Sequence, residues 1–361
     1  MEAEKSRCER CILPRSYPGL SFDERGVCEL CTAHKPRRYL GEEALKEKVQ
    51  SILREHKSRN ATYDCIVGFS GGRDSTYLLY CLRKILGLRV LAYCAQHTFV
   101  PPVAEGNIRR VSEALGVDVQ IERHAYLQNC IRHFMLSWIH RPSAALVTTL
   151  CTGCRFGIFR GLYAAARAQN IPVVIVGGTP LERARYKTNL LRANPRSRGT
   201  LSLAAGYVCQ IAKNVRLISK PSCVVMQIDE YRYSQGRRMF RKHMELIGPF
   251  YRYLHWIEAD VNRTIKEQLC WQCDGRSTKT WKTDCEIAPL KSYMYRAMLG
   301  FNDDDDHLSW LVRDGQITRE EALDRLRKDR EVPMEAVKSA LARLDIDYAD
   351  FEEALSRAAL Q

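Results

Sequence analysis

Short apolar runs alternate with segments of helical periodicity along the first two thirds of the chain. The apolar runs predict buried strands at residues 63–69, 89–95, 117–121 and 171–178. Helical spacing of the apolar positions predicts helices at 42–57, 76–84 and 105–115, and again from about residue 126. This alternation predicts an α/β fold with a doubly wound, Rossmann-like parallel sheet. Ligands of such sheets bind at the carboxyl ends of the strands.

The remainder of the chain has mostly helical patterns. Thr318-x-x-Glu321 predicts a capping box at a helix start, Pro333 suits the first turn of a further helix, and Asp350-x-x-Glu353 predicts a last one. The acidic run 303–306 is compatible with cation binding, but the favoured prediction is a solvated helix start. Aromatic residues alternate with basic ones over 230–256 and are expected in the core: Tyr231, Tyr233, Phe240, Phe250, Tyr251, Tyr253 and Trp256.

The net charge and the absence of long apolar runs limit the classes of binding partner. The chain has 361 residues and a net charge of +14, and residues 181–260 hold 15 Lys/Arg against 6 Asp/Glu. Such a surface suits an anionic partner, such as a nucleotide-sugar diphosphate, RNA or an acidic protein, although a solvated basic face is equally compatible. No run of 18 apolar residues and no apolar signal core are present, so we expect a cytoplasmic protein without a membrane partner.

The first predicted strand leads into Ser70-Gly71-Gly72-Arg73-Asp74-Ser75, which leads into a helix. Glycines allow backbone N–H groups to approach a phosphate, and the helix start adds aligned dipoles. The two serines supply hydroxyl donors. A carboxylate such as Asp74 would repel phosphate unless a divalent cation lies between them, so the loop predicts a site for phosphate and Mg²⁺.

Other residues follow the ends of predicted strands. Gly177 and Gly178 come after the fourth strand and are expected to converge with the 70–75 loop on one nucleotide. Glu182 follows them and is a candidate ligand of magnesium. His97 follows the second strand; it suits a contact with nucleotide or substrate, but a purely structural role is favoured.

The 15 cysteines include a metal-binding pattern. Cys8-x-x-Cys11 and Cys28-x-x-Cys31 supply four thiolates at the spacing of a closed, structural zinc site. The segment between the pairs is too short to bury a core of its own, so zinc would stabilise it. These residues predict a zinc knob over residues 1–40. It precedes a nucleotide-binding α/β domain over 41–230 and a mostly helical region over 231–361.

A second group of cysteines lies further along the chain. Cys151 and Cys154 open a predicted helix, and the later cysteines Cys270, Cys273 and Cys285 offer a third ligand, for which we favour Cys273. A [4Fe–4S] cluster, a second zinc ion or buried thiols without metal are all compatible with this set.

The 70–75 loop resembles the signature of the PP-loop ATP pyrophosphatases, Ser-Gly-Gly-x-Asp-Ser directly after the first strand, and it lacks the Gly-Lys-Ser/Thr ending of a Walker A loop. The resemblance implies that the loop binds ATP, with Asp74 and Ser75 in catalysis. Enzymes of this family cleave ATP between the α and β phosphates and adenylate a carbonyl or amide oxygen. A nitrogen or sulfur nucleophile then displaces AMP.

Two longer segments resemble the N-acetyl sugar amidotransferases of surface-polysaccharide assembly: Cys8-Glu-Arg-Cys-Ile-Leu-Pro with the following 17–28, and 307–323. This resemblance implies that ATP activates the N-acetyl oxygen of a nucleotide sugar and that ammonia replaces AMP. The ammonia is expected from a separate glutaminase-type partner or from free solution.

The second cysteine group departs from that family. It is similar to the ligand set of PP-loop tRNA thiolases, which implies an alternative function as an iron–sulfur-dependent sulfurtransferase acting on tRNA or a small molecule. A nucleotide-binding, metal-dependent scaffold is a third class, which the intact 70–75 signature disfavours.

Overall fold

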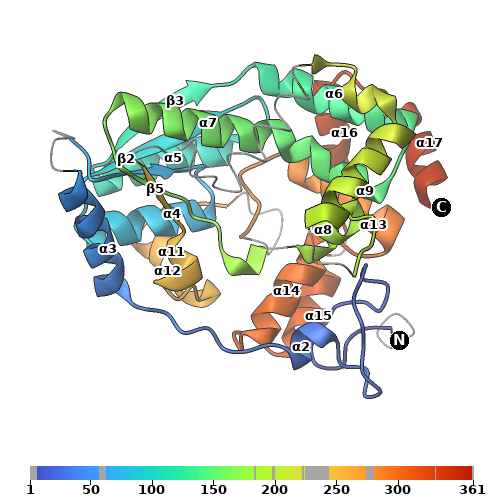
Figure 1. The fold of residues 1–361 in the computed structure, drawn as a ribbon, viewed down its shortest axis with the longest axis horizontal. Helices are drawn as coiled ribbons and strands as arrows, with labels where there is room; N and C mark the ends of the chain where they lie inside the picture. The colour runs from blue at the N-terminus through green and yellow to red at the C-terminus, as the bar shows by residue number, and fades with distance from the viewer. Residues whose placement is uncertain are drawn as a thin grey trace.

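The computed structural model describes residues 6–56, 62–182, 184–196, 200–221, 223, 244–273, 280–329 and 331–359 (Figure 1). The strands are β1 (Cys65–Gly68), β2 (Val90–Gln96), β3 (Asp118–Arg123), β4 (Val173–Ile175) and β5 (Glu245–Ile247). The helices up to the fourth strand are α2 (Glu29–Thr32), α3 (Glu42–Glu55), α4 (Arg73–Tyr80), α5 (Pro102–Leu115), α6 (Tyr126–His140) and α7 (Thr152–Ala168). Those that follow are α8 (Arg185–Leu191), α9 (Thr200–Lys213), α11 (Pro249–Arg252), α12 (Glu258–Leu269), α13 (Ile287–Leu299), α14 (Asp303–Arg313), α15 (Arg319–Lys328), α16 (Met334–Arg343) and α17 (Tyr348–Ala359).

The five strands form one sheet in the order β3-β2-β1-β4-β5, and every neighbouring pair is parallel. Ile66 of β1 pairs with Leu91 on one side and with Val174 on the other, so β1 is the central strand. Chain order therefore reverses direction at β1, which is where an open α/β sheet leaves a crevice for a ligand. The predicted doubly wound parallel sheet is confirmed.

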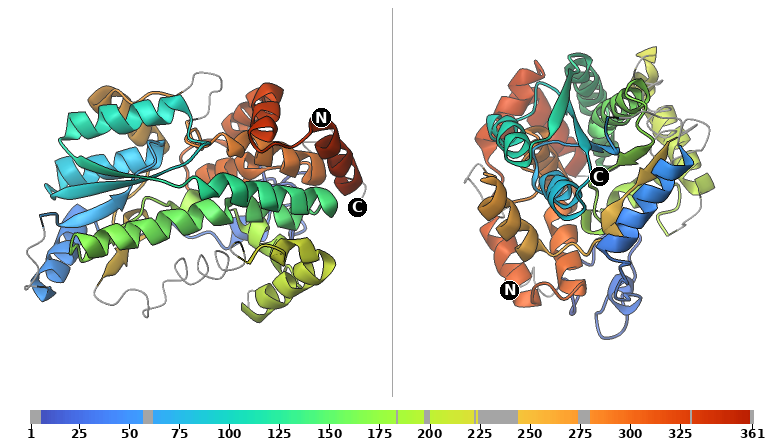
Figure 2. Two further views of the ribbon diagram at one scale, coloured as in Figure 1. Left: turned by 90° about the horizontal axis from the view of Figure 1, so that it is seen from above. Right: turned by 90° about the vertical axis from the view of Figure 1, so that its left-hand side faces the viewer.

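Both faces of the sheet are covered because the strands are apolar on both sides. Cys65 and Val67 face the core formed with α3, α4, α5 and α12, whereas Ile66 faces the opposite core, formed with α7. Figure 2 shows the sheet between these two helical layers. The four predicted strands are present within two residues at most boundaries, and β4 is shorter than its apolar run.

The edge strand β5 was not predicted. It has three residues and pairs in parallel with β4, Leu246 lying opposite Val174. So short a strand has no periodicity that a sequence pattern could show. Of the aromatic residues expected in the core nearby, Phe250 and Trp256 are buried; Tyr231, Tyr233 and Phe240 lie outside the described residues.

The helices after the sheet build a second core with α6. Helix α13 contacts α16 and α17, and α17 contacts α6. The Thr318 hydroxyl accepts the Glu321 N–H at the start of α15, Pro333 precedes α16, and α17 begins two residues before Asp350, close to the predicted starts. Among the described helices, none has both the length and the apolar character needed to cross a membrane.

The acidic run at the start of α14 is buried, and the prediction of a solvated helix start was wrong. Each of the four aspartates is at most 9% exposed. Asn302 caps the helix, and the aspartates bond to distant parts of the chain. Arg7 lies 2.6 Å from Asp305, Tyr17 lies 2.8 Å from Asp306, and Tyr186 and Lys187 each lie 2.6 Å from Asp303.

These contacts join the N-terminal segment and α8 to α14. A run of like charges ordinarily predicts exposure, because unpaired carboxylates are costly to bury. In the bonds just given, each partner that offsets this cost lies 116 to 298 residues away in the sequence. No local sequence pattern therefore reveals the pairing.

The burial of Asp306 should make the free energy of unfolding depend on pH. Burial raises the pKa of Asp306 to about 6, so the folded protein holds a proton that the unfolded chain releases at lower pH. The wild type should therefore lose stability as the pH rises from about 4 to 6, by roughly 3 kcal/mol at most from this residue.

Asp306→Asn removes the titration and keeps the hydrogen-bonding shape. We expect the melting temperature of this variant to rise relative to wild type over the same pH interval, measured by circular dichroism. A constant difference between the two proteins from pH 4 to 7 would contradict the prediction.

Candidate functional site

The 70–75 loop joins the end of central strand β1 to the first turn of α4 and forms a closed turn held by its two serines. Their hydroxyl oxygens lie 3.1 Å apart, the Ser70 N–H donates to Ser75 Oγ, and the Gly72 N–H donates to Ser70 Oγ. Ser70 remains exposed at the carboxyl edge of the sheet. The loop amides and the amino end of α4 thus present donors to an anion.

Gly71 is required by the geometry. Its φ is +75°, and a Cβ at this position would lie 2.3 Å from the Ala104 carbonyl oxygen of α5. Its own carbonyl accepts hydrogen bonds from the Trp271 indole at 2.9 Å and from the Asn107 amide at 3.2 Å. The loop is therefore fixed from behind by α5 and by the segment after α12.

Arg73, the variable position of the signature, points away from the loop and is 2% exposed. Its guanidinium bonds to Asp74 at 2.8 Å, to Glu258 at 3.0 Å and to Thr280 at 3.0 Å, and it lies 4.6 Å over the Trp256 ring. The Trp256 indole also donates to Asp74 at 3.1 Å. These contacts hold the Asp74 carboxylate in place from its inner side.

Two more carboxylates lie by Asp74. Desolvation by the surrounding protein, and then the charge of Asp74, raise the pKa of Glu182 to about 8, although solvent still reaches the Glu182 side chain. Burial, together with Asp74, also raises the pKa of Asp284, which bonds to Ser70. Neighbouring carboxylates with raised pKa values indicate a place for a cation. The structure thus brings Glu182 to the loop as expected, and it adds Asp284, which the sequence did not indicate.

Two lysines bring positive charge to the same place. Lys187 of α8 bonds to the buried Asp303 at 2.6 Å, and Lys282 bonds to the same carboxylate. The Lys282 ammonium also acts electrostatically on Glu182 and Asp284, so it lies within the site. Burial lowers the pKa of Lys187 to about 7, although Asp303 opposes this shift. Neither lysine follows a strand or belongs to a motif, so sequence analysis missed both.

The residues at other strand ends separate into two kinds. Gly177 lies against α4, where a Cβ would be 3.4 Å from Ser75 Cα, and Gly178 lies beside the Tyr251 ring hydroxyl. The glycine end of β4 therefore does converge with the 70–75 loop. His97 instead accepts the Phe99 N–H at 3.2 Å, and burial lowers its pKa to about 4, as suits the structural role favoured for it.

The four N-terminal cysteines form one buried group. Their sulfur atoms lie within 4.8 Å of one another, with 3.9 Å between Cys8 and Cys31 and 3.8 Å between Cys11 and Cys28. Zn–S bonds of about 2.3 Å in a tetrahedron place sulfurs about 3.8 Å apart. The group fits structural zinc.

The remaining cysteines are placed less compactly. Lys291 donates to Cys151 Sγ at 2.8 Å, and burial followed by the charge of Cys151 raises the pKa of Cys285 to about 12. Cys154 and Cys285 pack against the second core, whereas Cys273 packs against the core beneath the sheet. Of the three candidate third ligands, Cys285 is thus the one that the described structure places near Cys151.

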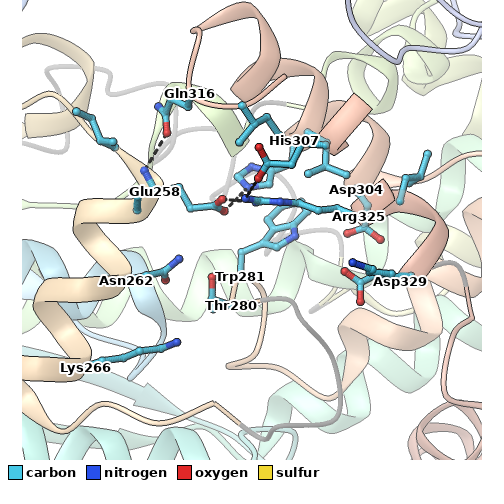
Figure 3. Close-up of a pocket in the computed structure, with 17 residues that line it drawn as sticks. Glu258, Asn262, Lys266, Thr280, Trp281, Asp304, His307, Gln316, Arg325 and Asp329 are labelled. Atoms are coloured by element: carbon cyan, nitrogen blue, oxygen red, sulfur yellow. Dashed lines mark hydrogen bonds and ion pairs between the residues drawn. The ribbon is translucent and has the colours of Figure 1, made fainter. Parts of the chain in front are cut away.

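A cavity of about 510 Å³ opens behind the loop, between α12, α14 and α15 (Figure 3). Glu258, Asn262 and Lys266 project into it from one face of α12. Burial opposes ionisation of Glu258, yet hydrogen bonding from His307, with the charges of Arg73 and Arg325, lowers its pKa. Glu258 therefore serves as the anionic anchor that fixes Arg73.

Comparison with known proteins adds information on the C-terminal part. Residues 252–359 match the family described as "LPS biosynthesis protein WbpG-like, C-terminal domain". An uncharacterized protein of Methanocaldococcus jannaschii, MJ1599, is 31% identical over 123 residues, which are 33% of this chain and 43% of that protein. The chain thus spans less than half of this relative.

Three solved structures are similar in outline. An NMN synthetase from Francisella tularensis has 12% identity and a TM-score of 0.39, over 85% of this chain and 98% of that one. A U34-tRNA thiolase from Methanococcus maripaludis with its [4Fe-4S] cluster has 14% identity and a TM-score of 0.36, over 94% of this chain and 88% of that one. An NH3-dependent NAD synthetase from Campylobacter jejuni has 16% identity and a TM-score of 0.30, over 58% of this chain and 99% of that one. Likenesses of this size do not establish a shared function, so the site is assigned on its own geometry.

The zinc site yields a direct test. Cys8→Ser should abolish binding of about one zinc per chain and lower the melting temperature markedly, because the N-terminal segment has little core of its own. Zinc is measured by inductively coupled plasma mass spectrometry on purified protein. Cys209→Ser, at an exposed cysteine of α9, is the matched control and should retain zinc. Equal zinc content in the two variants would exclude this ligand set.

Proposed function

We propose that this protein is an AMP- and pyrophosphate-forming amidotransferase of the PP-loop type. It would adenylate a carbonyl or amide oxygen, the N-acetyl group of a nucleotide sugar, for attack by ammonia. The observation that carries the proposal is the pairing of an anion-binding 70–75 loop with the Asp74 and Glu182 carboxylates. A loop that binds phosphate and also presents carboxylates suits a nucleotide held together with a divalent cation.

The donors of the loop suit the phosphate chain of ATP. The backbone N–H groups at the start of α4 and the hydroxyl of the exposed Ser70 would supply these donors, with the Ser75 hydroxyl 3.1 Å from that of Ser70. Gly177 and Gly178 line the same edge without side chains, which leaves room for a nucleotide. This is the arrangement that the signature predicts for ATP.

Asp74 and Glu182 would hold Mg²⁺. Among the described residues, only the four N-terminal cysteines bring three or more ligand atoms within 4.8 Å of one another. The magnesium site is therefore incomplete in the protein alone, and phosphate oxygens and water would complete it, as is usual for Mg²⁺. The chemistry that the ion supplies is neutralisation of phosphate charge during cleavage.

Lys187 and Lys282 would act on the developing negative charge. Cleavage between the α and β phosphates releases pyrophosphate, and fixed cations stabilise the charge that accumulates on it. Asp303 holds both ammonium groups in position, at 2.6 Å for Lys187.

The choice of acceptor rests on sequence. The match of residues 252–359 to a WbpG-like lipopolysaccharide biosynthesis family supports a role in polysaccharide assembly, and it covers less than a third of the chain. A glutaminase-type partner supplying ammonia remains part of the proposal. An adenylated acetyl group must be shielded from water, since hydrolysis would waste the ATP.

Isotope transfer tests the proposal. With a nucleotide sugar labelled with ¹⁸O in its acetyl carbonyl, plus ATP, Mg²⁺ and ammonium, AMP should acquire the label, because AMP leaves with the oxygen that it activated. Mass spectrometry of AMP provides the readout. AMP formed without label, or an absence of sugar-dependent AMP, would contradict adenylation of the acetyl group.

The variant Asp74→Asn should lower the rate of AMP formation in this assay by roughly 100-fold or more. Glu113→Gln, at an exposed position of α5, makes the same chemical change away from the loop and should leave the rate unchanged. If Asp74→Asn retained the wild-type rate, the loop would not handle the metal–phosphate complex.

One contact favours a second candidate function, sulfur transfer to tRNA or a small molecule. The Lys291 ammonium lies 2.8 Å from Cys151 Sγ, which stabilises a thiolate, and Cys285 lies nearby. For this function we expect iron and acid-labile sulfide in protein purified without oxygen, both lost in Cys151→Ser. Zinc as the only metal, unchanged in Cys151→Ser, would leave amide transfer as the supported function.

A further inference from the structure

A second cavity, of about 490 Å³, lies between the zinc segment, the start of α8 and the last turns of α14. It shares no residue with the 70–75 loop or with the cavity behind it. Aromatic and basic side chains supply most of its polar lining: His34, Lys35, Arg37, Arg185, Trp310 and Arg313. We call this cavity the basic pocket.

The described lining of the basic pocket holds more positive than negative charge. Lys35, Arg37 and Arg185 form no ion pair with any residue in the described part of the chain. Among the described lining residues Glu29 is the one carboxylate; it accepts a hydrogen bond from the neutral Ser21 hydroxyl at 2.8 Å, keeps its negative charge and so offsets one of the four cations. Cations gathered in a concave surface raise the local potential and concentrate anions there.

The metal site accounts for only one of these cations. Arg313 is 6% exposed and donates to Cys11 Sγ at 3.5 Å, so zinc-bound thiolates would balance its charge. In the described part of the chain, Lys35, Arg37 and Arg185 form no hydrogen bond with the four cysteines. Unlike the charge of Arg313, the charge of these three residues is available to a ligand other than the metal.

An indole ring lies among the cations. The guanidinium of Arg313 lies 4.7 Å from the centre of the Trp310 ring and that of Arg37 lies 6.0 Å from it, while His34 meets the ring edge at 6.2 Å. The Trp310 indole N–H is buried and has no acceptor among the described residues. A half-buried aromatic ring bordered by cations suits a flat base next to phosphate.

We infer that the basic pocket binds a nucleoside diphosphate or the nucleoside diphosphate part of a larger ester. Lys35, Arg37 and Arg185 would pair with the diphosphate, and Trp310 with the base. The volume is that of a small-molecule site. A single aromatic platform fits one nucleotide, whereas a nucleic acid strand needs successive platforms along a groove.

The basic pocket and the proposed catalytic site share α14 as a common support. Trp310 follows Asp303 by seven residues, about 10 Å along the helix axis. Arg185 and Lys187 lie two residues apart on α8; the first lines the pocket and the second bonds to Asp303. The inference does not require turnover, and it holds whichever reaction the 70–75 loop supports.

Binding to the full-length, zinc-loaded protein tests the inference. A non-hydrolysable ATP analogue at saturation blocks the 70–75 loop, and UDP is then titrated by isothermal calorimetry. Wild type should bind UDP, and Arg37→Ala/Arg185→Ala should raise the dissociation constant roughly tenfold or more, since two charged donors are lost. Lys84→Ala/Arg109→Ala, which removes the same charge from exposed positions elsewhere, should bind as wild type does.

The base contact is tested separately with pyrophosphate. Wild type should prefer UDP to pyrophosphate, and Trp310→Phe should reduce that preference. Unchanged UDP affinity in Arg37→Ala/Arg185→Ala would overturn the inference. So would equal affinity of wild type for UDP and pyrophosphate, or binding of a single-stranded RNA oligomer without binding of UDP. The exposed arginines carry no core packing, and zinc content and melting temperature verify that each variant is folded.

Discussion

Four buried carboxylates at the start of α14 impose the constraint on which the rest of this structure depends. Burying such a run is strongly unfavourable unless each carboxylate finds a charged or hydrogen-bonding partner. Asp305 bonds to Arg7 of the N-terminal segment, Asp306 accepts a hydrogen bond from Tyr17, and Asp303 bonds to two lysines and a tyrosine. The N-terminal segment that carries the four cysteines, α8 and the loop before α13 are therefore held against one helix turn.

The same constraint shapes the candidate site. Lys282 bonds to Asp303, and Asp284, two residues on, reaches Ser70 of the 70–75 loop. On the other side of the loop, Arg73 is tied to Glu258, which also bonds to Arg325 of α15 at 2.6 Å. The sheet supplies the phosphate-binding turn, and the C-terminal helices supply the charges around it. Neither part would form the site alone.

The first turn of α14 is acidic, whereas its last turns border a basic pocket. Its first turn is acidic and is neutralised by protein groups, which fixes the lysines of the candidate catalytic site. Its last turns carry Trp310 and Arg313 into the basic pocket, where Lys35, Arg37 and Arg185 form no ion pair with any described residue. The first arrangement stabilises the fold, whereas the second is suited to an external anion.

The sequence by itself determined what depends on neighbouring residues. Strand periodicity, the strand–loop–helix context of Ser70 to Ser75, and the two Cys-x-x-Cys pairs are local patterns, and the folded chain retains the corresponding strands, turn and four-cysteine group. Tertiary structure alone decided which charges are buried together. Strand β5 is too short to show a period, and Asp284, Lys187 and Lys282 stand in no motif. Their positions follow from pairing across more than a hundred residues or from loops packed on distant helices, and no local spacing encodes such pairing.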